Sequence, residues 1–239
     1  MKQLTRHSLS NGDQDQERCA IWGLQAIDLH EARWRSRGVQ VVHRGVQFKK
    51  IPGTELYLLL EPSQMALFDL AEIAEAMVWN RAMLTRVRII ESQEDEFREQ
   101  VVLDDGGKVK KIERLYVRDS RAKYRVILTC SEAIASLWAE SDNRRSGWIS
   151  LRKIANRSIA SERVSGHCFD VNNDGDDQQL ISHLVATWTD PSRAIDGISE
   201  VEEGIWAVSG TRLAENAVCN PPAWIGYAPR SGLDEMLAG

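Results

Sequence analysis

The stretch Glu55-Leu-Tyr-Leu-Leu-Leu60 decides the fold, because its residues 56–60 are the longest purely apolar run in the chain with the character of a strand. Pro52 and Gly53 precede it, and Pro62 follows it. An unbroken apolar run between turn residues is typical of a strand that is buried on both faces of a sheet. The sequence therefore predicts an interior strand at this point, within a mixed sheet formed by residues 38–128.

The segments around this run show strand and helix patterns in turn. Residues 84–90 alternate apolar and polar side chains, as a half-exposed strand does. Asp104-Asp-Gly-Gly107 predicts a hairpin, since glycine adopts the positive φ of a tight reversal. Further strands are expected at residues 39–42, 97–103, 109–117, 124–128 and 164–171, and helices at residues 15–37, 68–79, 131–140, 148–155 and 177–188. This order predicts an α/β fold with a mixed sheet and flanking helices.

Asp69 lies at the start of the helix expected at residues 68–79. An aspartate at the N-cap with a glutamate three residues later forms a capping box, and Glu72 stands at that spacing. We therefore expect Asp69 to be the N-cap of this helix.

Composition excludes several classes of protein. The chain has 239 residues, of which 43% are hydrophobic and 27% charged, and its formal net charge is −5. This balance is typical of a globular protein and gives no general attraction to nucleic acid or anionic membranes. No apolar run is long enough to insert into a membrane, and residues 1–16 lack the apolar core of a secretory signal. The four cysteines form no Cys-x-x-Cys pair, so we expect free thiols and a cytoplasmic location.

The predicted organisation has three parts. Residues 1–16 form a flexible lead-in, residues 17–195 an α/β domain, and residues 196–239 a C-terminal segment. In that segment Leu213, Cys219 and Ile225 recur every six residues, with the small Ala217 and Ala223 between them. A six-residue period builds one face of a triangular β-solenoid. We expect a partial left-handed β-helix whose open end favours a homo-oligomer; an irregular tail is the alternative.

Two local patterns could indicate a metal site or a reactive thiol. Residues 170–175 match the first half of a calcium loop, but Ile181 occupies the position that needs a bidentate glutamate, so no tight calcium site is expected. The cysteines are scattered, so no tight zinc site is expected either. His167 and Cys168 are adjacent on an expected strand, with His183 in the next helix. A thiol and an imidazole can form a nucleophile or a metal site. Because neighbours on a strand face opposite ways, a core cysteine with a surface histidine is preferred.

Two stretches resemble sugar nucleotidyltransferases. Residues 55–62 with residues 68–72 are similar to the middle of that family, where a buried strand ends in an acidic residue and a helix follows. Residues 99–113 are similar to its hairpin, which leads to Glu-Lys-Pro. More loosely, residues 37–42, 204–206 and 223–226 resemble the cytoplasmic N-terminal region of bacterial priming sugar-phosphate transferases of exopolysaccharide synthesis.

The resemblance implies a nucleotidyltransferase-like scaffold that departs from the family at its reactive positions. The glycine-rich nucleotide loop is absent from residues 1–60, Glu61 replaces the metal-binding aspartate, and Arg114 stands where the lysine of Glu-Lys-Pro would be. No catalytic residue is identified. The resemblance and the strand ends imply a ligand site at Glu61, with Asp69 and Arg114 as companions.

The function implied is an accessory protein of bacterial cell-surface polysaccharide biosynthesis that recognises a sugar phosphate or nucleotide sugar. Its partner would be a glycosyltransferase of that pathway. An active sugar nucleotidyltransferase or glycosyl-phosphate transferase component is one alternative, and Mg²⁺ would then be its cofactor. A structural interaction module is the other.

Overall fold

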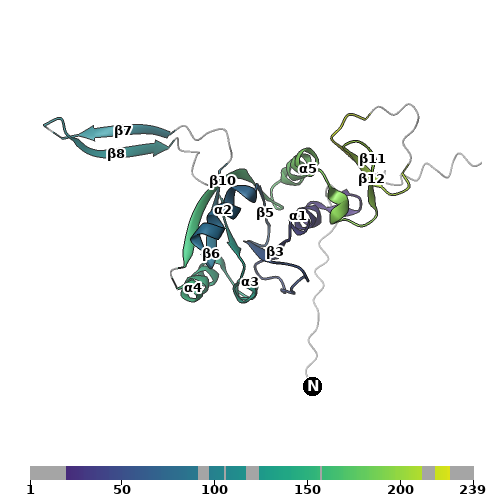
Figure 1. Ribbon diagram of the computed structural model, residues 1–239, viewed down its shortest axis with the longest axis horizontal. Coiled ribbons are helices and arrows are strands. Elements are labelled where there is room, and N and C mark those ends of the chain that lie inside the picture. Colours follow the sequence, from purple (N-terminus) through teal and green to yellow (C-terminus); the bar gives the residue numbers. More distant parts are fainter. Residues whose placement is uncertain are drawn as a thin grey trace, which may run out of the picture.

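The computed structural model describes residues 20–90, 97–104, 106–116, 124–156, 158–211 and 219–226. Its centre is a six-stranded mixed sheet in the order β3-β4-β9-β6-β10-β5 (Figure 1). The strands are β3 (Val39–His43), β4 (Leu56–Leu60), β5 (Gln64–Phe68), β6 (Leu84–Ile90), β9 (Tyr124–Thr129) and β10 (Ile159–Asp170). Within the described residues the helices are α1 (Ala26–Arg35), α2 (Ala71–Asn80), α3 (Glu132–Ala139), α4 (Arg144–Ala155) and α5 (Asp176–Thr187).

The sheet is strongly curled. β3 and β4 are parallel, as are β6 and β10, and the other neighbours are antiparallel. β5 begins at Gln64, directly after the turn that follows β4, yet it pairs with β10 at the opposite edge. The four chain steps from Leu60 to Gln64 can span at most about 14 Å. The edge at β5 must therefore come close to β4.

The prediction for the apolar run is confirmed. β4 lies between β3 and β9, and Leu58 and Leu59 are only 0% and 1% exposed. Leu58 packs in the cluster on the concave face of the sheet, whereas Leu59 packs with the residues beneath α3 and α4. Burial on both faces thus explains why the run does not alternate with polar residues.

Helices cover both faces of the sheet. Trp34 of α1 and Ile73 of α2 belong to the concave core, while Trp138 of α3 and Leu151 of α4 pack on the convex face. α5 packs beside α1 through a third cluster that includes Leu180. The mixed α/β architecture expected from the sequence is therefore present.

The start of α2 corrects one expectation. Residues 64–68 form the edge strand β5, and the helix begins at Ala71 with Leu70 as N-cap. Asp69 is therefore not the N-cap, although its Oδ1 accepts a hydrogen bond of 2.9 Å from the backbone N–H of Ala71. The strand extends to Phe68 because β10 lies beside it and pairs with it as far as that residue, a contact that no local pattern contains.

The N-terminal helix is shorter than expected. Trp22 and Gly23 have φ values of 56° and 77°, so they turn the chain between β1 (Ala20–Ile21) and β2 (Leu24–Gln25). The helical pattern expected from residue 15 cannot continue through a left-handed turn, and α1 starts only at Ala26. Residues 15–19 lie outside the described part.

The expected hairpin is present. β7 (Phe97–Leu103) and β8 (Val109–Tyr116) pair antiparallel, and Asp104 Oδ1 accepts hydrogen bonds of 2.9 Å from the N–H groups of Gly106 and Lys108. Figure 1 shows these two strands standing away from the central sheet.

The C-terminal segment contains a small sheet. β11 (Ile198–Glu202) pairs antiparallel with β12 (Ile205–Val208), which pairs in parallel with β13 (Ala223–Ile225). Trp224 stacks on Trp22 with ring centroids 4.7 Å apart, so this sheet packs on the N-terminal side of the fold. Leu213 and Ala217 lie outside the described residues, and the solenoid coil stays a prediction.

Within the described part of the chain, no helix combines the length and the apolar character needed to cross a membrane.

Candidate functional site

The first candidate site is a cleft on the convex side of the sheet, which we call the arginine cleft. It has a volume of about 590 Å³, within the usual size range of ligand pockets. Its lining comes from the ends of β4 and β5, from β6 and β9, and from α3 and α4: Leu59, Glu61, Gln64, Arg86, Arg125, Ile127, Trp138, Arg144, Arg145 and Trp148. Four arginines and one carboxylate share this space.

Strand register places the arginines of the sheet on one face. Arg86 of β6 lies opposite Ile127 of β9, and Arg88 lies opposite Arg125. Because side chains two residues apart on a strand share a face, these arginines point to the side that α3 and α4 cover elsewhere.

α4 contributes Arg144 and Arg145 in its first turn. The N-terminal end of a helix carries partial positive charge, so acidic residues are favoured there and arginines are not. The first turn of α4 has no acidic residue. Asn143 caps the helix instead, and its Oδ1 accepts a hydrogen bond of 2.9 Å from the N–H of Ser146. The positive end of α4 and its two arginines therefore add to the positive potential of the cleft.

Glu61 is held at the mouth of the cleft by Arg44. The Nε and Nη2 atoms of Arg44 both donate to Glu61 Oε2, at 2.9 and 2.7 Å. Arg44 Nη1 also donates to the carbonyl of Asp142 at 2.7 Å, which fixes the guanidinium between two parts of the chain. Glu61 Oε1 is buried and has no hydrogen-bond partner among the described residues, and Arg144 Nε lies 3.6 Å from it. Oε1 is thus an acceptor that has an ion-pair partner, Arg144, but no hydrogen bond among the described residues.

Arg86 lies over the indole of Trp148, with its Cζ 4.6 Å from the ring centroid. Burial lowers the pKa of Arg86, and the positive charges of Arg125, Arg88 and Arg152 lower it further. An arginine surrounded by other arginines indicates positive charge in excess of what the protein itself neutralises. The cleft can therefore bind an anion with several oxygens, because guanidinium groups match phosphate in shape and charge.

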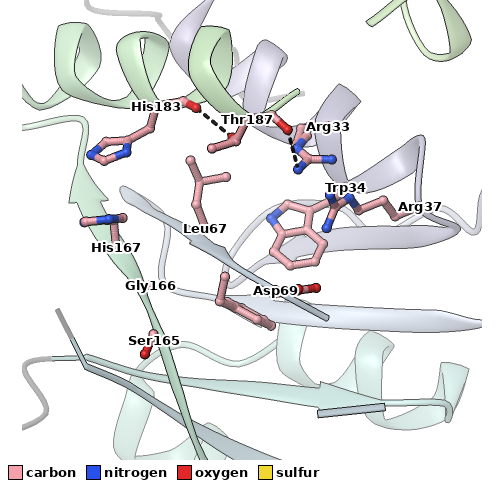
Figure 2. Close-up of a pocket in the computed structure, with 11 residues that line it drawn as sticks. Arg33, Trp34, Arg37, Leu67, Asp69, Ser165, Gly166, His167, His183 and Thr187 are labelled. Atoms are coloured by element: carbon pink, nitrogen blue, oxygen red, sulfur yellow. Dashed lines mark hydrogen bonds between the residues drawn. The ribbon is translucent and has the colours of Figure 1, made fainter. Parts of the chain in front are cut away.

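The second candidate site is a smaller cavity between α1, α5, β5 and β10, which we call the histidine pocket (Figure 2). Its volume is about 380 Å³. It is lined by Arg33, Trp34, Arg37, Leu67, Phe68, Asp69, Ser165, Gly166, His167, His183 and Thr187. Arg33 Nη2 donates to the carbonyl of Thr187 at 3.4 Å, which links α1 to α5.

The two histidines of this pocket come from different elements and meet ring to ring. The ring centroids of His167 and His183 are 4.0 Å apart. Burial lowers the pKa of His183, and the neighbouring His167 lowers it further. Cys168 lies on the opposite face of β10, where it is 6% exposed in the concave core. The expectation that His167 and Cys168 diverge is confirmed.

The three site residues expected from the sequence are not brought together. Glu61 lines the arginine cleft, and Asp69 lines the histidine pocket. Arg114 lies on β8 opposite Glu99 of β7, in the hairpin that stands away from the sheet.

Sequence reasoning missed the arginines of the cleft. The signal was present, since Arg86 and Arg88 alternate along a strand and Arg144 and Arg145 open a helix that has no acidic residue in its first turn. The sequence did not show that β6 pairs with β9, or that α4 packs beside these strands.

The half calcium loop forms a turn closed by its own side chains. Asp176 Oδ2 accepts from the N–H of Asp170 at 2.8 Å, and Asp170 Oδ1 accepts from the N–H of Asn172 at 2.9 Å. Across the described residues, no three His, Cys, Asp or Glu side chains group as a metal site would require.

No protein-family model matches this chain, and no curated protein matches it. One similar solved structure is a putative glucose-1-phosphate thymidylyltransferase from Bacillus anthracis in complex with a sucrose. The sequence identity is 13% and the TM-score is 0.28. The match covers 54% of each chain, so this chain spans about half the length of that structure.

Proposed function

We propose that this chain recognises a sugar phosphate or nucleotide sugar in the arginine cleft, as an accessory protein of bacterial cell-surface polysaccharide biosynthesis. The observation that carries the proposal is the charge of the cleft. Arg86, Arg125, Arg144 and Arg145 line it, and the single carboxylate among the lining residues, that of Glu61, is shared between Arg44 at 2.7 Å and Arg144 at 3.6 Å. An anionic ligand would neutralise the positive charge of the arginines that Glu61 does not neutralise.

The carboxylate at the mouth favours a ligand that also carries hydroxyl groups. Glu61 Oε1 is buried and has no hydrogen-bond donor among the described residues. Leaving such an atom without a donor costs about 1–3 kcal/mol, and more when the group is charged. A sugar hydroxyl donated to Oε1 removes this penalty while the phosphate lies among the arginines. A ligand with both groups therefore fits better than inorganic phosphate.

The sequence resemblance to sugar nucleotidyltransferases supports the same class of ligand. It also favours recognition over catalysis, since residues 1–60 carry no glycine-rich nucleotide loop and backbone N–H groups in such a loop are hard to replace. Release of pyrophosphate from a nucleoside triphosphate and a sugar phosphate would instead indicate the active enzyme.

The wider setting belongs to the same proposal. We place the protein in the cytoplasm, beside a glycosyltransferase of the pathway, and we assign residues 196–239 to a partial β-helix through which copies associate. Genes for glycosyltransferases and polysaccharide export next to this gene would support the pathway; their absence would count against it.

The test is titration calorimetry with UDP-glucose, glucose 1-phosphate and glucose. Arg144→Gln is the cleanest variant, because the side chain is 61% exposed and its loss should leave the fold intact. We expect it to weaken glucose 1-phosphate binding about fivefold to tenfold, in line with a charge-assisted hydrogen bond that is partly exposed to water.

Arg86→Gln should weaken binding more, by about thirtyfold, since that guanidinium is more deeply placed. The matched control is Lys153→Gln, which removes a positive charge from the same helix but does not line the cleft. Equal loss in Arg144→Gln and Lys153→Gln would show that only overall charge matters. Absence of binding to the wild type would overturn the proposal.

A further inference from the structure

The histidine pocket carries four basic side chains from three elements. Arg33 comes from α1 and Arg37 follows α1 one helical turn later, while His167 comes from β10 and His183 from α5 (Figure 2). Arg37 lies just beyond the C-cap of α1, and both arginines line the cavity. The pocket thus resembles the arginine cleft in its excess of basic groups, although it uses different strands and helices.

A single carboxylate opposes these groups. Asp69 lies between β5 and α2, and its Oδ1 already accepts the N–H of Ala71. Burial is the main cause that lowers the pKa of Arg33, to about 10; the charge of Arg37 adds to it, and Asp69 acts in the opposite direction. Arg33 still carries its charge at neutral pH. The remaining polar groups that face the cavity, on Ser165 and Thr187, are uncharged.

The imidazole pair gives the pocket a property that the arginine cleft lacks. The ring centroids of His167 and His183 are 4.0 Å apart, and burial, followed by the neighbouring His167, lowers the pKa of His183. Neither ring forms a hydrogen bond with another described residue, and the two rings contact each other and Phe169. An anion beside the rings would counteract the lowering of the pKa and favour a proton on the pair.

We propose that the histidine pocket is a second oxyanion site, which takes a dianionic phosphate group and binds it together with a proton from solvent on the His167–His183 pair. Arg33 and Arg37 supply permanent positive charge, and the pair supplies charge that depends on pH. The site does not depend on the function of the arginine cleft.

Sulfate is the probe, because it keeps its double negative charge between about pH 6 and pH 8, where histidine titrates. The measurement is NMR of the histidine side chains, with His167→Gln and His183→Gln used to identify their signals. We expect sulfate to raise the titration midpoint of the pair, while chloride at the same ionic strength does not. This readout reports on the histidine pocket even if the arginine cleft also binds sulfate.

Two variants on the same side of the fold complete the test. Arg37→Gln should abolish the sulfate response, because it removes a guanidinium that faces the cavity. Arg35→Gln is the matched control, since Arg35 lies two residues away but lines a different cavity, beside Asp28 and Glu31. The control should respond like the wild type. A wild type without a sulfate-specific shift, or a shift of equal size in Arg37→Gln, would overturn the proposal.

Discussion

The arginine cleft and the histidine pocket assemble positive charge in two different ways. In the cleft, Arg86 and its neighbours carry charge at any pH a cell reaches, and Arg44 neutralises the one carboxylate. In the pocket, two imidazoles stand beside the arginines, and the charge of an imidazole depends on pH. Under the two proposals both sites should therefore bind oxyanions, but they should differ in how pH controls the affinity.

The two sites also differ in the surroundings of their carboxylates. Glu61 is held by two hydrogen bonds from Arg44 to its Oε2, whereas its buried Oε1 has no hydrogen bond among the described residues and lies 3.6 Å from Arg144 Nε. Asp69 instead serves the start of α2 and reduces the positive charge of its pocket. Under the two proposals the first carboxylate accepts a hydroxyl group of the ligand, and the second one should weaken the binding of an anion.

The largest expected contrast is in the response to pH. Sulfate binding in the histidine pocket should weaken about tenfold from pH 6 to pH 8, since one proton taken up on binding changes the affinity by at most tenfold per pH unit. UDP-glucose binding in the arginine cleft should change by less than about twofold over the same range, because neither arginine nor the diphosphate titrates there. Calorimetry at both pH values measures this, and equal slopes for the two ligands would contradict the distinction.

Glu61→Gln separates the sugar from the phosphate. We expect about fivefold weaker binding of glucose 1-phosphate, because the hydroxyl loses a charged acceptor. Binding of inorganic phosphate should stay the same or strengthen, since a negative charge leaves the cleft. Calorimetry with both ligands on one protein preparation provides the comparison. Parallel losses for both would mean that Glu61 only supports the fold through Arg44.

Asp69→Asn should have the smallest effect and the opposite sign. The amide oxygen can still accept the N–H of Ala71, so α2 should keep its start, while the opposing charge is removed. Sulfate should then bind the histidine pocket about threefold more tightly, as expected for the loss of one partly exposed charge. The histidine NMR titration reports it, with glucose 1-phosphate binding as the unchanged reference. Weaker sulfate binding would show that Asp69 positions Arg33.

Local sequence patterns predicted the strands and helices themselves better than they predicted which strands pair. The residues of β4 and of the turn at Asp104 are enough to predict their structure. The apolar run of β4 indicates burial on both faces, and the glycines of the turn permit a positive φ. The sequence of β5 does not predict a strand, because its strand conformation depends on pairing with β10. The expected start of α1 was likewise overridden by the left-handed turn at Trp22.

The candidate site was predictable only in part. The position of Glu61 follows from the rule that ligands lie at strand ends, and the structure places it in a cleft. The expected companions followed from sequence similarity alone, and Asp69 and Arg114 lie elsewhere. The arginines that define the cleft come from β6, β9 and α4. Only the register of the sheet and the packing of the helix bring them beside Glu61.

The most direct measurement of the central claim is a crystal structure of the protein with glucose 1-phosphate bound. We predict the phosphate among Arg86, Arg125 and Arg144, with a sugar hydroxyl within hydrogen-bond distance of Glu61 Oε1. The ligand bound only in the histidine pocket, or a sugar that points away from Glu61 into solvent, would contradict the account.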